Sequence, residues 1–434
     1  MTLHKKYILP AILLLLFGFR LGFGLCSEFW FEDEMQIYLI GLKFFSTGAF
    51  PFFGPDIVYT GSQIPGALQG LLVGLPFYVL PIPEAPYLLL NLLTFSALCL
   101  FAYWLNRRFT GIPWWFTWIW VLTCPWVMNL GTHVLNPSYV LPAAIIFFIS
   151  FFEAVPVLSS GMLSKTKAYL LMGFSMIWIA QFHMSWVLLL PFALTALIVG
   201  MRDGWKRTLI YCALMAGGFL LAGVTLIPTF MKYGLNGGSG GSMHNIVFNP
   251  DNLKQGFTLL SRLLSFGSFE ASRFLGSNTA ARFAFIRDYW WASPFIIFAG
   301  IIGFAQALWL GISFFLKNPS PHFKQVKILL IAAFVLTWAS FVFSVKGPSS
   351  HTFYLMFPLV MIYSFYCWQN LFVRKWFRIL MVLLLVSGIV FHTTVGMENY
   401  KKRSMYVNRS IPVKAITEKN YKILGERRSW DRNN

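Results

Sequence analysis

The sequence has little charge for its length. Charged residues make up 11% of its 434 residues, hydrophobic residues make up 57%, and the mean hydropathy is positive. A soluble protein of this size normally carries about 25% charged residues. Apolar runs long enough to cross a bilayer, roughly 17 to 25 residues each, recur between residues 7 and 395 with no polar domain between them. The composition therefore excludes a soluble globular protein and predicts a single polytopic, all-α membrane unit.

Acidic residues and cysteines are also scarce. The chain has 15 Asp and Glu against 34 Lys and Arg, which gives a net charge of +19. The basic residues form small clusters between apolar segments, the pattern that orients membrane helices, so nucleic acid is not an expected partner. The five cysteines lie mostly within apolar runs and without metal-ligand spacing, which predicts packing roles and no metal site.

The apolar runs predict a bundle of about eleven transmembrane helices. No small-residue cleavage site follows the basic and apolar N-terminus, so the first run is expected to remain as a helix. The expected spans are residues 7–25, 86–105, 112–130, 139–157, 168–182, 184–200, 208–230, 292–316, 328–345, 353–370 and 377–395. Residues 1–395 would form the membrane module and residues 396–434 a basic tail.

The apolar piece at residues 62–83 decides the topology. With a cytoplasmic N-terminus, all the short basic loops fall inside if this piece lies at the interface; if it crosses, their parity inverts and they fall outside. Its prolines and glycines also favour an interfacial helix over a straight span. This leaves two long outer loops, 26–85 and 231–291, and an outer C-terminal tail, although the tail carries ten Lys and Arg.

The second outer loop has two parts. GLNGGSGGSMHN, residues 234–245, predicts a flexible stretch, and NLKQGFTLLSRLL, residues 252–264, predicts a short amphipathic helix on the membrane surface. A mobile segment above an outer cavity would suit a lid over a substrate.

Glu32, Asp33 and Glu34 stand together at the start of the first outer loop, where the following segment has helical periodicity. Its apolar positions Ile37, Tyr38, Leu42 and Phe45 predict an amphipathic helix that holds the acids at its N-terminus. Taken alone, acids at this position serve to start a helix. We assign Glu32 to that capping role, and the wider pattern gives the other two acids a catalytic interpretation.

That pattern is an Arg near the outer end of the first helix, then Asp33-Glu34, Gly48 fourteen residues after the Glu, a segment rich in Pro and Gly, and a second helix that ends in Arg-Arg. It resembles the C-type (GT-C) membrane glycosyltransferases, namely the protein O-mannosyltransferases and lipid A aminoarabinose transferases. The segment HTFYLMFPLV, residues 351–360, is similar to their Tyr-containing stretch before a late helix. The resemblance implies a GT-C bundle, a polyprenyl-phosphate sugar donor and an essential Asp in the first outer loop.

The sequence departs from this family in three places. Ile37 stands where the family usually has Tyr, and Gln63, Ile64 and Pro65 replace a Lys-Pro-Pro segment. The loop THVLNPSY has no second Asp, which leaves a metal role without support. The cofactor therefore stays open.

The reaction itself suggests roles for individual residues. Transfer of a sugar from a lipid phosphate to a hydroxyl needs a carboxylate near the anomeric carbon and cations around the leaving phosphate. We expect Asp33 to act as the base and Glu34 to support it or to bind a metal. The expected phosphate-binding residues are Arg20, Lys346, His351 and Tyr354.

Several of these residues have a simpler alternative. Arg20 can snorkel to outer headgroups from its helix. Lys346, His351 and the loop arginines Arg273, Arg282 and Arg287 can be solvated charges, and His133 and His183 can be structural.

The predicted activity is an inverting hexosyl or pentosyl transfer at the outer face of a bacterial inner membrane. The acceptor can be a lipid, a glycan or a protein, and membrane lipids surround the enzyme. Two other classes stay open: a flippase or transporter for lipid-linked sugars, and an O-antigen polymerase or ligase. The sequence shows no internal repeat of the kind that transporters have. Dependence of activity on Asp33 would separate the glycosyltransferase from the polymerase or ligase.

Overall fold

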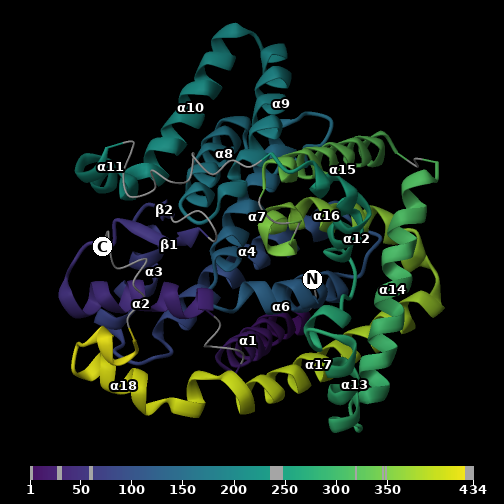
Figure 1. Ribbon diagram of the computed structural model, residues 1–434. Coiled ribbons are helices and arrows are strands. Elements are labelled where there is room, and N and C mark those ends of the chain that lie inside the picture. The colour runs from purple at the N-terminus through teal and green to yellow at the C-terminus, as the bar shows by residue number, and fades with distance from the viewer. Residues whose placement is uncertain are drawn as a thin grey trace.

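The computed structural model describes residues 3–26, 32–57, 62–234, 248–317, 320–344, 347 and 349–425, and this part of the chain is almost entirely helical (Figure 1). Two short strands, β1 (Phe53–Ile57) and β2 (Ser62–Pro65), pair antiparallel. The α-helices are α1 (Leu3–Cys26), α2 (Glu32–Thr47), α3 (Leu68–Val79), α4 (Ala85–Arg108), α5 (Trp114–Thr123), α6 (Pro125–Gly131), α7 (Asn136–Ala154), α8 (Lys165–Ala180), α9 (Leu190–Gly200), α10 (Trp205–Gly223), α11 (Ile227–Tyr233), α12 (Gly256–Ser265), α13 (Thr279–Asp288), α14 (Ser293–Phe315), α15 (Pro321–Ser340), α16 (Phe357–Trp368), α17 (Lys375–Arg403) and α18 (Ser410–Thr417).

Within the described ranges, eight helical stretches are long and apolar enough to cross a membrane, which agrees with an all-α polytopic membrane protein. The other three expected spans fall on shorter or interrupted helices. Residues 112–130 divide into α5 and α6, because the backbone of Cys124 is extended and Pro125 has no N–H to continue the helix. Residues 168–182 fall on α8, which has 16 residues, and residues 353–370 begin in a 3₁₀ turn, Ser350–Met356, before α16. Residues 353–368 are buried in protein, where irregular backbone is tolerated at membrane depth, whereas residues 168–182 are partly buried and partly half-buried.

The segment at residues 62–83 does not form a spanning helix. It begins as strand β2 rather than as the helix expected there, and α3 has 12 residues. At 1.5 Å per residue α3 is about 18 Å long, well short of the roughly 30 Å of a bilayer core. It packs closely on α2, where a Cβ at Gly41 would lie 2.4 Å from Val73 and one at Gly74 would lie 2.6 Å from the Gly41 carbonyl.

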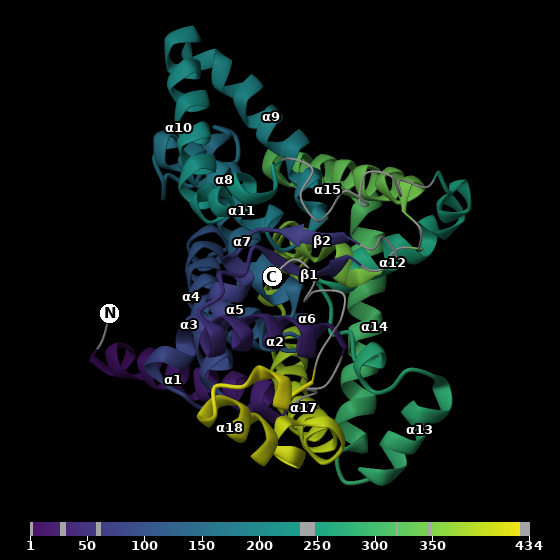
Figure 2. The ribbon, with the colours of Figure 1, turned by 60° about the vertical axis from the view of Figure 1, so that its left-hand side comes forward.

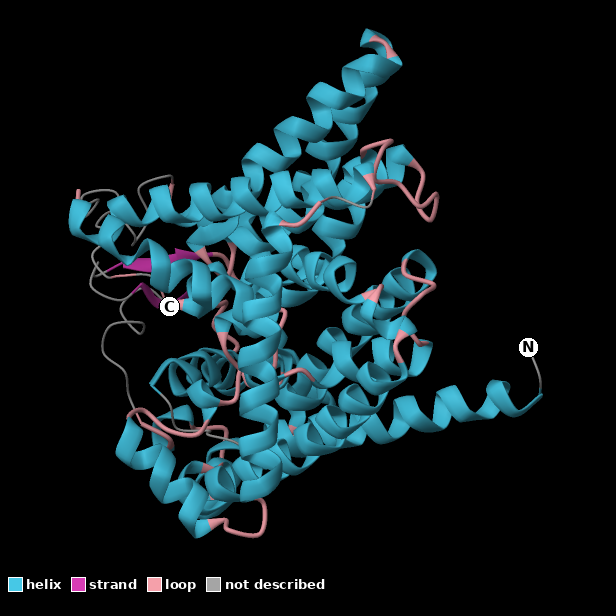
Figure 3. Ribbon diagram, turned by 90° about the vertical axis from the view of Figure 1, so that its right-hand side faces the viewer, coloured by secondary structure: helices cyan, strands magenta, loops and turns pink. Residues whose placement is uncertain are grey.

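Contacts join the loops that the charge pattern assigns to one side of the membrane. Arg108 donates to the Leu158 carbonyl and, at 3.2 Å, to the Tyr366 hydroxyl. Lys165 and Asp203 form an ion pair with a separation of 2.6 Å. In Figure 3 the N-terminal end of α1 points to one side of the molecule and the two strands lie toward the other.

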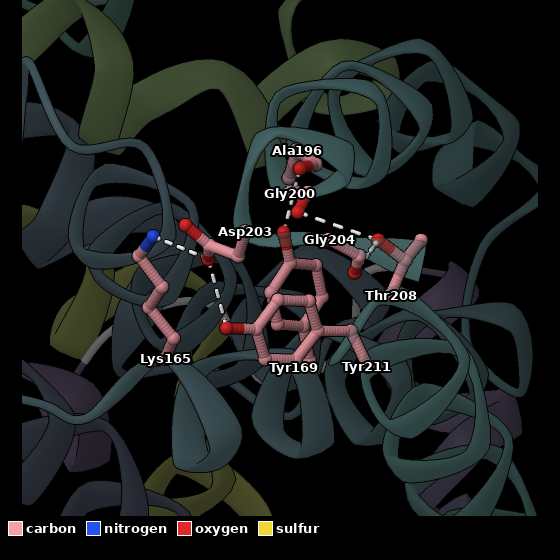
Figure 4. A network of polar contacts seen from close by, with 8 residues as sticks. All are labelled: Lys165, Tyr169, Ala196, Gly200, Asp203, Gly204, Thr208 and Tyr211. Carbon is pink, nitrogen blue, oxygen red and sulfur yellow. Dashed lines mark hydrogen bonds and ion pairs between the residues drawn. The ribbon is translucent and has the colours of Figure 1, made fainter. Parts of the chain in front are cut away.

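The helices α8, α9 and α10 are held together by the polar network of Figure 4. Asp203 accepts from Lys165 and, at 2.9 Å, from the Tyr211 hydroxyl. The ring of Tyr169 stacks on that of Tyr211 at 4.3 Å, and its hydroxyl donates to the Ala196 carbonyl at 2.6 Å. Every polar group in this network has a partner, so we assign it a structural role.

The C-terminal tail packs against the first long loop. α17 continues to Arg403, beyond the boundary expected at residue 395. After it, α18 lies close to α2 (Figures 1 and 2). Arg409 pairs with Glu84 at 2.9 Å, and Lys419 lies 5.5 Å from the centre of the Phe45 ring. The tail therefore shares one side of the molecule with α2 and α3.

Candidate functional site

The first turn of α2 separates the two candidate carboxylates. Consecutive residues of an α-helix point about 100° apart. Asp33 is exposed, whereas Glu34 is 1% exposed. The side chain of Glu32 lies outside the described part. The expected apolar face of α2, which includes Ile37, Tyr38 and Leu42, is buried as predicted.

Glu34 is held by two segments that are distant in sequence. Its Oε1 accepts a hydrogen bond from the Tyr87 hydroxyl at 2.8 Å and one from the Val134 backbone N–H at 2.9 Å. Hydrogen bonds to an ionised acceptor are about twice as strong as neutral ones. The carboxylate is thus fixed between α4 and the connection from α6 to α7.

One face of α4 continues the polar contacts inward. Tyr87, Asn91 and Thr94 are four and three residues apart, so they lie on the same side of the helix. Asn91 donates to the Thr132 carbonyl at 3.5 Å, and the Thr94 hydroxyl accepts from Arg20 at 3.4 Å. From Tyr87 to Thr94 the rise along α4 is about 10 Å.

The connection from α6 to α7 forms the opposite wall. The Gly131 carbonyl accepts from Arg20 at 3.2 Å, and its successors Thr132 and Val134 contact Asn91 and Glu34. A Cβ at Gly24 of α1 would lie 2.6 Å from the Thr132 carbonyl oxygen, so α1 packs directly on this wall. We call this set the polar seam: Arg20, Glu34, Tyr87, Asn91, Thr94, Gly131, Thr132 and Val134.

Arg20 is completely buried, so it does not snorkel to headgroups. Besides its bonds to Thr94 and Gly131, it donates to the Leu122 carbonyl at 2.8 Å. In the described part of the chain no carboxylate pairs with it, and its Nε–H has no acceptor. Backbone carbonyls hold an uncompensated positive charge at the inner end of the seam.

Three further buried polar atoms near the seam have no hydrogen-bond partner among the residues that the structure describes: Asn91 Oδ1, the Tyr139 hydroxyl and Gln69 Oε1. Tyr139 is within electrostatic range of Glu34, and Gln69 donates to Asn136 at 2.7 Å. Buried polar atoms are nearly always satisfied in proteins, by protein, water or ligand. This cluster therefore has spare hydrogen-bonding capacity for a polar ligand.

A second cluster carries positive charge. The ring of His351 is accessible, but nearby protein removes part of its hydration. This desolvation, together with the positive charges of Arg273 and Arg262, lowers the pKa of His351 to about 4. Burial and the nearby His351 likewise lower the pKa of His183 to about 4. These electrostatic contacts place the four side chains close to one another. We call His183, Arg262, Arg273 and His351 the basic recess.

Trp126 of α6 links the recess to the interior. The Arg273 guanidinium lies 5.4 Å from the centre of the Trp126 ring. Tyr354, 1% exposed, donates to the Trp126 carbonyl at 3.2 Å. Because α6 leads from Trp126 to Gly131, the recess and the seam lie at the two ends of one short helix, about 10 Å apart by its length.

The structure thus sorts the residues that the sequence suggests. Glu34 lies in the polar seam, with Arg20 deeper in it, and Asp33 is its exposed neighbour in the chain. His351 and Tyr354 lie near the other end of α6. Lys346 and most of the expected flexible stretch, from residue 235 onward, lie outside the described residues. The expected surface helix is present as α12, which contributes Arg262 to the recess.

His133 lies buried between these groups, its Nδ1 3.3 Å from the Thr132 hydroxyl, and burial lowers its pKa to about 4. Among the described residues no three His, Cys, Asp or Glu side chains converge in a way that could hold a metal ion.

Sequence reasoning missed Tyr87, Asn91 and Thr94. A usable signal was present, because these polar residues recur at helical spacing within an otherwise apolar run. Their partners Glu34, Thr132 and Arg20 come from three other segments, which no local pattern connects.

Comparisons of this chain with protein-family models, with curated proteins and with solved structures found no match.

Proposed function

We propose that this protein is a GT-C-type membrane glycosyltransferase that moves a sugar from a polyprenyl-phosphate donor to a lipid, glycan or protein acceptor. The main support is the start of α2, where an exposed Asp33 adjoins a buried Glu34 that two hydrogen bonds hold in place. This arrangement gives an accessible base with a rigid neighbour at the end of a membrane helix bundle. The resemblance implies a site at the outer face of a bacterial inner membrane.

In this proposal the reaction is a single displacement. The acceptor oxygen forms a bond to the anomeric carbon while the bond from that carbon to the phosphate oxygen breaks, and the configuration inverts. Asp33 takes the acceptor's proton, since a neutral hydroxyl is a poor nucleophile. The negative charge that leaves with the lipid phosphate requires cationic or N–H donors.

Two places can supply those donors. The basic recess offers accessible Arg273 and His351 side chains, whereas Arg20 offers a buried charge whose Nε–H has no acceptor in the described part of the chain. Arg20 already uses its other donors on protein oxygens, so we assign it a long-range electrostatic role and assign direct phosphate contact to the recess.

The decisive experiment replaces Asp33 by Asn and measures consumption of polyprenyl-phosphate sugars in membranes. Asp251→Asn is a matched control, because Asp251 is an exposed acid in the other long loop that pairs with Lys254. We expect Asp33→Asn to abolish transfer at normal protein levels and Asp251→Asn to leave transfer unchanged. Full transfer by Asp33→Asn would remove the catalytic assignment.

One observation favours the polymerase or ligase class as a second candidate: Arg262 and Arg273 of the late outer loop gather around His351. Such an enzyme would act on a lipid-linked glycan and depend on the arginines more than on Asp33. Loss of activity in Arg273→Gln, with Asp33→Asn fully active on a lipid-linked glycan, would favour that class.

A further inference from the structure

An apolar groove of about 510 Å³ runs between the first and the last long helices. One wall comes from α1 and the other from α17, and each contributes residues at helical spacing. Its lining residues on α1 include Gly18, Gly22 and Cys26, and those on α17 include Gly396 and Lys401. No residue of α2 or α4 lines it, so the groove is separate from the carboxylates.

Glycines create this groove. A Cβ built at Gly18 or Gly22 would have no atom of the described residues within 4 Å, so open space faces both positions. On the other wall, a Cβ at Gly396 would meet the Phe23 ring at 3.5 Å. Both helices are candidate membrane spans, so we expect lipid around the groove.

The end of the groove near Lys401 is cationic. Lys401 is exposed, and in the described part of the chain it forms no ion pair, although its Nζ lies 5.5 Å from the centre of the Tyr289 ring. Lys402 pairs with Glu398. Two lysines against one glutamate leave a net positive charge at this end of α17, where lipid headgroups would lie.

We propose that the groove binds an acyl chain of an anionic phospholipid whose phosphate contacts Lys401. Charge decides between this occupant and a second copy of the chain. A symmetric dimer through this face would bring the same cationic patch of both copies together, whereas an anionic headgroup complements it. The proposal stands whether or not the protein is a glycosyltransferase.

The affinity must come from packing and from the headgroup, because leaving a bilayer for an apolar groove gains no hydrophobic energy. One lysine near a membrane surface gives about a fivefold preference for an anionic over a neutral headgroup. We therefore expect photoreactive phosphatidylglycerol to label α1 and α17 about five times more than photoreactive phosphatidylcholine.

The test uses the full-length protein in mixed vesicles of these two lipids. Gly22→Leu should fill the groove and abolish labelling of both helices. Gly300→Leu is its matched control, since Gly300 lies on the span α14 and has equal open space. Lys401→Gln should make the two lipids label equally, while Lys324→Gln, at an exposed lysine on α15, should keep the preference.

Two results would overturn the proposal. Unchanged labelling of Gly22→Leu would mean that the lipid lies elsewhere on these helices. Disulfide-linked dimers of Gly18→Cys in native membranes, at the expense of lipid labelling, would identify a second copy as the occupant. Thermal unfolding of each variant in detergent shows whether the variant is folded. Loss of labelling in a folded variant then results from the filled groove and not from misfolding.

Discussion

Replacement of Tyr87 by Phe tests whether the polar seam fixes Glu34. The substitution keeps the ring and deletes one hydroxyl, which donates to the Glu34 carboxylate at 2.8 Å in a fully buried position. A hydrogen bond to a charged group contributes about 1.5–3 kcal/mol. We expect stability to fall by about that amount, and sugar transfer to fall by roughly 10-fold or more if Glu34 positions Asp33.

The matched control is Tyr363→Phe. Tyr363 is also fully buried, but its hydroxyl donates to the Leu310 carbonyl at 2.6 Å, a neutral acceptor on α14 that is not part of the seam. This variant should lose about 0.5–1.5 kcal/mol of stability and keep its transfer activity. Stability would be measured by thermal unfolding in detergent micelles, and transfer activity by donor consumption in membranes.

A double-mutant cycle completes the test. If Tyr87 acts through Glu34, the effects of Tyr87→Phe and Glu34→Gln should fail to add, with a coupling of at least about 1 kcal/mol. Additive effects, or a Tyr87→Phe protein as stable and active as the wild type, would refute the inference that this contact holds the carboxylate.

Three other predictions follow from the described contacts. Arg20→Lys keeps the charge but loses the planar fork that reaches both Leu122 and Gly131, so stability in micelles should fall, and a wild-type unfolding temperature would contradict this. In the folded protein the pKa values of His183 and His351 lie near 4, below the ordinary value of about 6.5. The contribution of these residues to stability should therefore be complete above about pH 6.5 and decline as the pH falls toward 4. His183→Gln should reduce this decline. Single cysteines at Arg107 and Lys165 should react with an impermeant thiol reagent from one side of the membrane, and cysteines at Glu84 and Arg409 from the other; labelling of Arg107 and Glu84 positions from the same side would refute the topology.

Much of the helical framework follows from local patterns. The periodicity of α2 and α12 and the apolar length of α4 are visible in the sequence, and the structure has helices at each place. The break at Cys124–Pro125 was less visible, because the surrounding run is apolar enough to read as one span. Pro125 lacks an N–H wherever it lies, but a helix break at membrane depth is tolerated only where protein packs around it.

The glycine that supports the family resemblance also has a local explanation. Gly48 has φ of +72°, and its N–H donates to the Phe44 carbonyl at 2.9 Å, just after α2 ends. A glycine in the left-handed region at this position commonly terminates a helix. Its distance from Glu34 therefore reflects the length of α2, and the argument for a glycosyltransferase depends more on the carboxylates than on this spacing.

The acids at residues 32–34 show where sequence reasoning ends. Helical periodicity predicts that Asp33 and Glu34 point in different directions, but which of them is buried depends on Tyr87 and Val134, which lie 53 and 100 residues from Glu34 in the chain. In the proposed glycosyltransferase, these contacts would give the two acids different roles. A buried carboxylate with fixed partners is suited to holding the start of α2 in place, whereas only the exposed Asp33 can receive a proton from an arriving acceptor without the bundle opening. The geometry thus gives a physical reason to assign the chemistry to Asp33 and the positioning to Glu34, which the order of letters alone does not supply.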